Sequence, residues 1–169
     1  MKAIWERKSV RKFEERTVEP EKIKKLLYAG MSAPTACNQR EWEFIVVNDR
    51  ELLKLLGNNN PYAAPAGRAP LVIIPVINRK RVSHGAYCDQ DMGAACENIL
   101  LEATILGLGS VWLGISPRKE RMEQVSRVLH LPEYIEAFAM LAIGYSKDTL
   151  EEKNRFDEKR VHYNMFSSY

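Results

Sequence analysis

Four short apolar runs, separated by stretches with helical spacing, are the feature of this sequence that most restricts its fold. The runs cover residues 44–47, 71–77, 110–115 and 138–143. Apolar runs of this length that are rich in β-branched residues are typical of buried strands. Strands that alternate with helices predict one sheet covered by helices, in the α/β or the α+β class. Pro75 predicts that the second strand lies at a sheet edge or carries a bulge. A further helix is expected to continue to residue 129, with Ser116 as its cap and Pro117 as its first residue.

The stretches between the runs carry apolar residues at steps of three and four, which predicts amphipathic helices. Pro20 suits the first position of one helix, and Pro34 ends it. A short helix is expected over residues 50–56. The longest helix is expected over residues 90–106, with Gly107 closing it.

Length and composition indicate a single domain that spans residues 1–169. The 46% of hydrophobic residues excludes a disordered chain. A chain of this length buries roughly 70% of the surface that its unfolded form exposes, so it needs no metal or disulfide to fold. The three cysteines form no C-x-x-C pair, so no disulfide framework and no metal site is predicted. No apolar leader opens the sequence, and the most apolar long stretch, residues 92–115, contains two glutamates. We therefore expect a cytoplasmic protein without a membrane partner.

The positive charge of the chain is concentrated at its amino end. Residues 1–25 hold nine basic and five acidic side chains, whereas the whole chain carries a net charge of only +3. A net charge this small does not imply a nucleic-acid partner, and the cations are not interleaved with aromatic residues as in single-strand binding proteins.

Two polar segments have the composition of ligand-binding loops. The first contains Arg7, Lys8, Ser9 and Arg11, and guanidinium groups beside a hydroxyl suit a phosphate monoester. The second, residues 33–43, places turn-forming and hydrogen-bonding residues directly before a buried strand, where ligands are commonly held. A solvated basic surface and an ordinary helix-to-strand connection are the alternative interpretations of these two segments.

Two further segments carry weaker signals. Residues 107–114 are rich in glycine, but they follow a helix and precede a strand, which is the reverse of the dinucleotide-binding order. Their glycines are expected to cap the helix and to let the backbone approach a flat ligand. Lys153 and Arg155 form a late cationic pair, for which a solvated tail is the alternative.

Together these segments resemble the nitroreductase family of flavin-dependent oxidoreductases over nearly the whole chain. The residues that carry the resemblance are Arg7, Ser9, Arg11 and Phe13; Pro34, Thr35, Asn38, Trp42 and Phe44; Asp91, Gly93, Ala95 and Asn98; residues 107–112; and Lys153 with Arg155. The chain departs from the family pattern at Arg40 and Glu41, where Gln-Pro is frequent, and at Cys37, where a small polar residue is frequent.

The resemblance implies an α+β, three-layer fold, in which a mostly antiparallel sheet is flanked by helices, and an interlocked homodimer. It implies FMN bound between the two subunits, with a carboxyl tail from about residue 145 to residue 169 packing on the partner. The residues it assigns to FMN are Arg7, Lys8, Ser9, Arg11, Lys153 and Arg155 around the phosphate, ribityl chain and polar ring edge; Pro34, Thr35, Ala36 and Asn38 from the partner; and the backbone at Leu113 and Gly114 against the ring.

The implied activity is transfer of hydride from NADH or NADPH through FMN to a nitroaromatic, quinone or similar acceptor, with ping-pong kinetics. No side chain is nominated as catalytic, because the cofactor carries the chemistry. A reductive dehalogenase or related flavin enzyme, and a flavin-storage protein without activity, remain as alternatives. Cys37 is expected to be a small filler, with ring contact or a redox role as the other interpretation.

Overall fold

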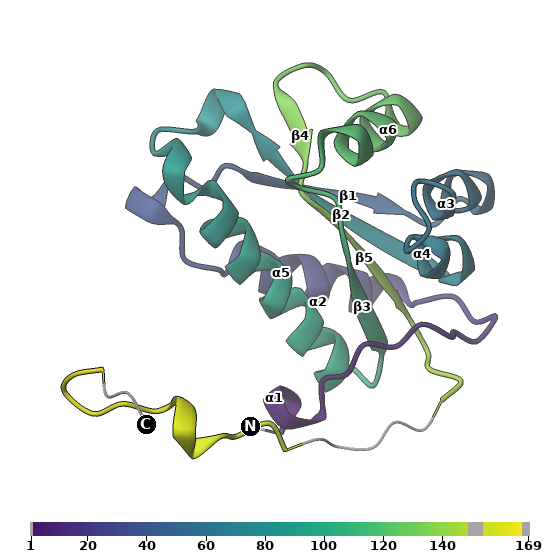
Figure 1. Cartoon of the computed structure of the whole chain (residues 1–169). Coiled ribbons are helices and arrows are strands. Elements are labelled where there is room, and N and C mark those ends of the chain that lie inside the picture. The colour runs from purple at the N-terminus through teal and green to yellow at the C-terminus, as the bar shows by residue number, and fades with distance from the viewer. Residues whose placement is uncertain (1, 149–153, 167–169) are drawn as a thin grey trace.

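A five-stranded antiparallel sheet between two helical layers forms the body of the protein (Figure 1). The computed structural model describes residues 2–148 and 154–166. The helices are α1 (Ala3–Glu6), α2 (Pro20–Met31), α3 (Arg50–Gly57), α4 (Ala64–Arg68), α5 (Cys88–Ile105) and α6 (Lys119–Leu129), with short 3-10 turns η1 (Ala36–Asn38), η2 (Arg79–Arg81), η3 (Gly85–Tyr87) and η4 (Glu158–Arg160). The strands are β1 (Trp42–Val47), β2 (Leu71–Asn78), β3 (Gly109–Gly114), β4 (Ile135–Ala137) and β5 (Ala139–Gly144).

The sheet has the order β1-β2-β5-β3, and β4 pairs with β2. Side chains alternate between the two faces of each strand, as the strand period requires. On β2, Val72, Ile74 and Val76 enter the core beneath α3, α4 and α6. Leu71, Ile73 and Ile77 enter the second core, beneath α2 and α5. The predicted α+β class with one antiparallel sheet is therefore confirmed.

Pro75 lies in a central strand, so the expected edge position is wrong. β2 pairs with β1 on one side and with β4 and β5 on the other. Between the pairs Ile73↔Leu141 and Val76↔Ala137, three residues of the β4–β5 segment face two residues of β2. One extra residue on one strand is a β-bulge, and it lies opposite the position where proline has no N–H to offer the ladder. A bulge is therefore present at Pro75, but the β4–β5 segment carries the extra residue and not β2 as expected.

The helix after β3 starts later than expected. α6 begins at Lys119, whereas Ser116 and Pro117 were expected as its cap and first residue. The amide of Ser116 donates to the carbonyl of Phe138 at 2.9 Å, so Ser116 still belongs to the hydrogen bonding of the sheet, and Arg118 occupies the cap position.

The long helix and its end follow the sequence pattern. α5 begins two residues before the expected start, and Gly107, with φ of +72°, lies just after it in the left-handed conformation that favours glycine. Within residues 2–148 and 154–166, no helix has both the length and the apolar character to cross a membrane.

Candidate functional site

The amino-terminal segment lies along the outer edge of β3. The amide of Val10 donates to the carbonyl of Ser110 at 2.9 Å, and Ser9 forms a parallel bridge with Ser110. Gly109 makes this close approach possible, because a Cβ there would come within 2.6 Å of Val10. The segment that follows continues across the end of β5, where Phe13 bridges Ser146.

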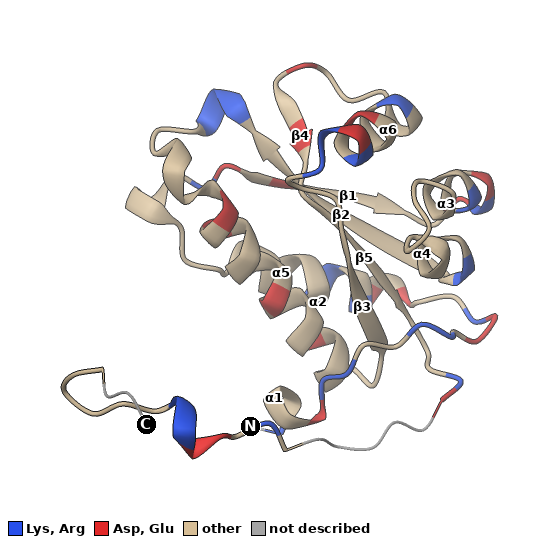
Figure 2. Ribbon diagram, viewed as in Figure 1, with Lys and Arg blue, Asp and Glu red and all other residues tan. Residues whose placement is uncertain are grey.

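All four predicted amino-terminal residues therefore lie beside the start of β3. Arg7 Nε is 3.4 Å from Glu97 Oε1 on α5, and Arg11 Nη1 donates to the carbonyl of Ser9 at 3.0 Å. Lys8 and Arg11 flank Ser9 on the same segment, which carries several of the basic residues shown in blue in Figure 2. The sequence pattern thus places a row of cations next to a sheet edge.

β3 is an edge strand, and half of its backbone groups point away from β5. In an antiparallel pair, the residues alternate between groups that face the partner strand and groups that face outward. Because the Ser110 carbonyl accepts from Val10, Ser110 faces outward, and so do Trp112 and Gly114. The Gly114 carbonyl accepts from Arg121 Nη1 at 2.9 Å, whereas Leu113 is buried in the core beneath α6.

An open surface lies over the carboxyl-terminal half of β3. A Cβ on Gly114 would meet no atom within 4 Å, and Trp112, packed edge-on against Phe138, is 36% exposed. Ser110 on the same face is buried, and its Oγ has no hydrogen-bond partner in the part of the chain that the structure describes. A flat surface with outward amides, bordered by cations, suits a planar ligand that carries an anionic group.

The loop before β1 is held by the amino-terminal end of α5. The amide of Ala36 donates to both carboxylate oxygens of Asp91, at 3.0 and 2.9 Å. Thr35 Oγ1 accepts from the amide of Arg40 at 3.1 Å, and Asn38 Oδ1 accepts from Arg40 Nε at 2.7 Å. The side-chain oxygens of Thr35 and Asn38 therefore accept hydrogen bonds from within the loop itself. Pro34 and Asn38 are exposed.

Gln39 joins this loop to two other segments. Its Nε2 donates to Asp91 Oδ2 at 2.9 Å and to Glu41 Oε1 at 3.1 Å. Its Oε1 accepts from the amides of Ser83 and His84, at 3.0 and 2.9 Å. Sequence reasoning noted Gln39 only as a polar loop residue, because nothing local indicates a partner some 50 positions away.

The three cysteines lie in different environments. Cys37 is exposed, and its Sγ is 3.6 Å from His84 Nε2. Cys88 and Cys96 are buried, and burial raises the pKa of both thiols above the usual value. A buried neutral thiol acts as a small apolar side chain.

The predicted residues form two groups within one chain. The segment with Arg7 and Arg11 lies beside the start of β3, whereas residues 34–38 lie at the amino-terminal end of α5. Figure 1 shows α1 beside the carboxyl-terminal end of α5, at the far end from residues 36–38. A single chain therefore does not bring the two groups around one ligand.

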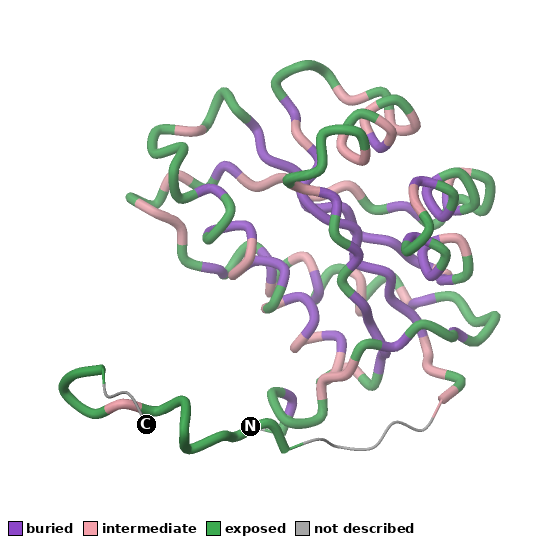
Figure 3. Tube along the Cα trace, in the orientation of Figure 1, coloured by how far each residue is buried: buried purple, intermediate pink, exposed green. Residues whose placement is uncertain are grey.

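The late cationic pair is described only in part. Lys153 lies outside the described residues, and Arg155 is exposed. The segment 154–166 runs away from the sheet, and nearly all of it is exposed in Figure 3. Residues 145–148, by contrast, pack on their own chain through backbone bonds to Lys12 and Glu14.

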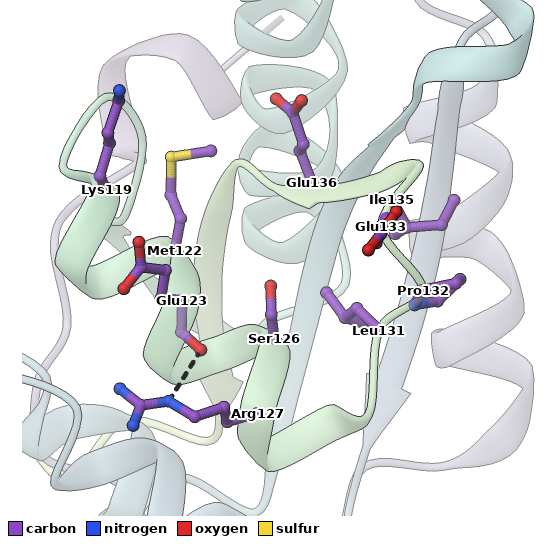
Figure 4. Close-up of a pocket in the computed structure, with 10 residues that line it drawn as sticks. All are labelled: Lys119, Met122, Glu123, Ser126, Arg127, Leu131, Pro132, Glu133, Ile135 and Glu136. Carbon is purple, nitrogen blue, oxygen red and sulfur yellow. Dashed lines mark hydrogen bonds between the residues drawn. The ribbon is translucent and has the colours of Figure 1, made fainter.

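A groove between α6 and the segment leading into β4 is separate from these residues (Figure 4). Both cations and acids line it, and Glu136 is already paired with Arg79 at 2.6 Å. Arg127 Nε contacts the Glu123 carbonyl on its own helix at 3.4 Å. None of the predicted site residues lines this groove, so the β3 edge is the stronger candidate.

Comparison with known proteins finds one matching family model and similar proteins that cover nearly the whole chain. The model of the nitroreductase family matches residues 4–65 and 56–145. A protein of Archaeoglobus fulgidus, provisionally named NADH dehydrogenase/NAD(P)H nitroreductase, is 40% identical over 96% of this chain and 95% of its own length.

Two solved structures extend this similarity to three dimensions. A provisionally named NADH oxidase of Clostridium acetobutylicum has a TM-score of 0.95 at 41% identity, covering 97% of this chain and 99% of that one. A protein of Clostridium difficile, named FMN-dependent nitroreductase, has a TM-score of 0.91 at 31% identity, covering 97% and 98%.

Proposed function

The chain belongs to the nitroreductase family, and from this membership we propose that it is an FMN-dependent oxidoreductase that uses NADH or NADPH. The relative from Clostridium difficile is named FMN-dependent, and the relative from Archaeoglobus fulgidus is named for NAD(P)H. The acceptors we propose are nitroaromatic compounds, quinones or similar small molecules, reduced by a ping-pong mechanism.

The observation that carries the proposal is the open surface at Gly114. An isoalloxazine ring is flat, and the structure leaves free space where a side chain at this position would stand. The outward amide of Gly114 is a donor at the edge of that surface. The backbone of Leu113 lies next to Gly114, and the Leu113 side chain packs in the core on the other face of the sheet.

The phosphate of FMN fits the amino-terminal segment. Arg7, Lys8, Ser9 and Arg11 follow each other along the start of β3, so a ligand lying along this strand meets cations at one end and Gly114 at the other. Guanidinium groups hold phosphate through paired charge-assisted hydrogen bonds. We assign Lys153 and Arg155 to the same phosphate.

A second copy of the chain completes the proposed site. Pro34, Thr35, Ala36 and Asn38 of one subunit would cover the ring held by the other, since they lie at the opposite end of α5 from the amino-terminal segment of their own chain. The tail offers the same argument for a homodimer, because Phe156, Tyr163, Met165 and Phe166 are 74–84% exposed. Exposed large apolar residues in such numbers are typical of a protein interface.

When bound, FMN would supply the redox chemistry, which is the transfer of hydride from the nicotinamide to the acceptor. The chain positions the ring through the β3 edge and excludes water from one side of it. The outward amides and the nearby cations are oriented to stabilise negative charge on the ring without reorganising. No acidic or basic side chain is assigned a catalytic role.

Absorbance spectroscopy of the purified protein tests the proposal. We expect a flavin spectrum, either as purified or after FMN is added, that bleaches when NADH or NADPH is added without oxygen. A colourless protein that FMN cannot reconstitute would overturn the proposal. Bound flavin that stays oxidised with both nicotinamides would instead indicate flavin storage.

A further inference from the structure

Two carboxyl groups lie close together in the interior, beneath the loop 34–40. Glu41 is 0% exposed and Asp91 is 7% exposed. One amide group, Nε2 of Gln39, donates to both, at 3.1 Å to Glu41 Oε1 and at 2.9 Å to Asp91 Oδ2. Two ionised carboxylates this close would repel each other strongly in a poorly solvated interior.

Asp91 has the environment of the ionised partner. Both of its oxygens accept from the amide of Ala36, and Gln39 adds a further donor. Asp91 also lies in the first turn of α5, where the helix dipole favours a negative charge. Three donor contacts and a helix amino terminus all stabilise a carboxylate at this position.

Glu41 has the environment of a protonated acid. Its Oε2 is buried and accepts no hydrogen bond from any described residue, a costly state for a carboxylate oxygen. Burial and then the charge of Asp91 raise the pKa of Glu41 above its ordinary value of 4.5. The Asp91 carboxylate shares the Gln39 donor with Glu41, so a proton on Glu41 has an acceptor beside it.

We propose that Glu41 and Asp91 hold one proton between them, carried by Glu41, and that this acid–carboxylate pair is the positioning device for the loop 34–40. The consequence for flavin binding rests on the proposed function, since that loop is the one assigned to the partner's ring. The pair itself is a property of this chain, which has Glu41 where the family pattern has proline.

The loop needs such an anchor because its backbone is strained. Cys37, Asn38 and Arg40 have φ of 50°, 56° and 48°, in the left-handed region that residues other than glycine rarely adopt. Conformations of this kind persist only where the surroundings hold them. The bonds from Ala36 and Gln39 to Asp91 are the contacts that tie the loop to α5.

The other titratable groups near Glu41 and Asp91 do not supply a positive charge that would let both carboxyl groups ionise. Cys88 faces Glu41 from α5, and its own pKa is raised by burial. Arg79 donates to Cys88 Sγ at 3.8 Å and is paired with Glu136. His84 reaches the pair only through Gln39. Among the described residues, no three His, Cys, Asp or Glu side chains are grouped as metal ligands.

Infrared spectroscopy of the full-length protein detects the proton directly. A protonated carboxyl has a carbonyl stretch that is separate from the bands of carboxylates and that shifts in D2O. At about pH 7 we expect such a band in the unmodified protein, its loss in Glu41→Gln, and its retention in Glu43→Gln. Glu43 is a matched control because it lies two residues after Glu41, in β1, and pairs with Arg81. No band, or a band that survives Glu41→Gln, would overturn the proposal.

Hydrogen exchange tests the positioning role. When Glu41 ionises at alkaline pH, we expect the protection factor of the Ala36 amide to fall by about tenfold or more, with the same midpoint as the loss of the infrared band. Glu41→Gln should keep its protection through the same pH range, because a neutral amide still donates to Asp91. Unchanged protection while the band disappears would overturn the role. If the variant does not fold, the two pH series on the unmodified protein decide.

Both measurements are independent of flavin. If the protein binds no FMN but shows the infrared band, and the Ala36 amide loses protection together with that band, the proton-sharing pair stands and only the proposed function is refuted. A flavoprotein without the band would retain the proposed function and refute the pair.

Discussion

Val10 occupies the space where a side chain on Gly109 would stand, because a Cβ there would lie 2.6 Å from Val10 Cγ2 and 2.8 Å from its Cβ. This contact holds the cationic segment against β3. A single glycine therefore connects the packing of the sheet edge with the proposed phosphate site.

Gly109→Ala should force the amino-terminal segment away from β3. We expect the free energy of unfolding to fall by about 1–3 kcal/mol, the usual cost of overpacking, and FMN retention to decrease with it. Gly93→Ala is the control for stability: an added Cβ meets nothing within 4 Å, and alanine favours the helix by roughly 0.5–1 kcal/mol. Urea unfolding measures both, and equal stability of the two variants would contradict the packing argument.

Arg11→Ala should weaken FMN binding by about tenfold or more while the fold is kept, because a charge-assisted bond to phosphate contributes about 1.5–3 kcal/mol. Arg11 is exposed and its one described bond is to the neighbouring Ser9 carbonyl. Arg68→Ala, at an exposed arginine on α4, is the matched control. Fluorescence titration with FMN measures the affinities, and identical values for both variants would remove Arg11 from the phosphate site.

Gly114→Val should leave the fold intact and abolish tight FMN binding. A Cβ at this position would meet no atom within 4 Å, so the melting temperature should change little. The new methyl groups would stand on the surface assigned to the ring. Unaltered FMN affinity in this variant would place the flavin elsewhere.

Much of the fold follows from local patterns, whereas the contacts that make the site do not. Pro20 at the start of α2 and Gly107 after α5 act through their own backbone preferences, so sequence alone predicts them. The late start of α6 was missed because Ser116 is held by Phe138 across the sheet. Glu41 was recognised as a departure from the family pattern, yet its meaning depends on Asp91, and a contact between residues 50 positions apart leaves no local signal.

Acid should destabilise the junction between α2 and the end of β5. The hydroxyl of Tyr145 donates to Glu19, and this bond, with help from Arg16 and Lys22, lowers the pKa of Glu19 to about 2. Because the folded-state pKa is below the ordinary 4.5, this contribution to stability is complete above about pH 4.5 and is lost as the pH falls toward about 2.

Tyr145→Phe removes that donor, so stability should depend less on pH between about 4.5 and 2. Tyr62→Phe, at an exposed tyrosine, should keep the original dependence. Urea unfolding at several pH values compares the slopes. A slope in Tyr145→Phe as steep as in the unmodified protein would show that Glu19 is not the responsible group.

The most direct test of the central claim, that two copies of the chain complete one FMN site, uses mixed dimers. Arg11→Glu damages the phosphate end, and Pro34→Trp places a bulky ring on the exposed loop assigned to the partner's flavin. Each variant alone should bind no FMN. Mixed dimers, purified through two different tags, contain one site with both changes and one intact site, so they should bind one FMN per two chains. Mixed dimers that bind no FMN would contradict the account.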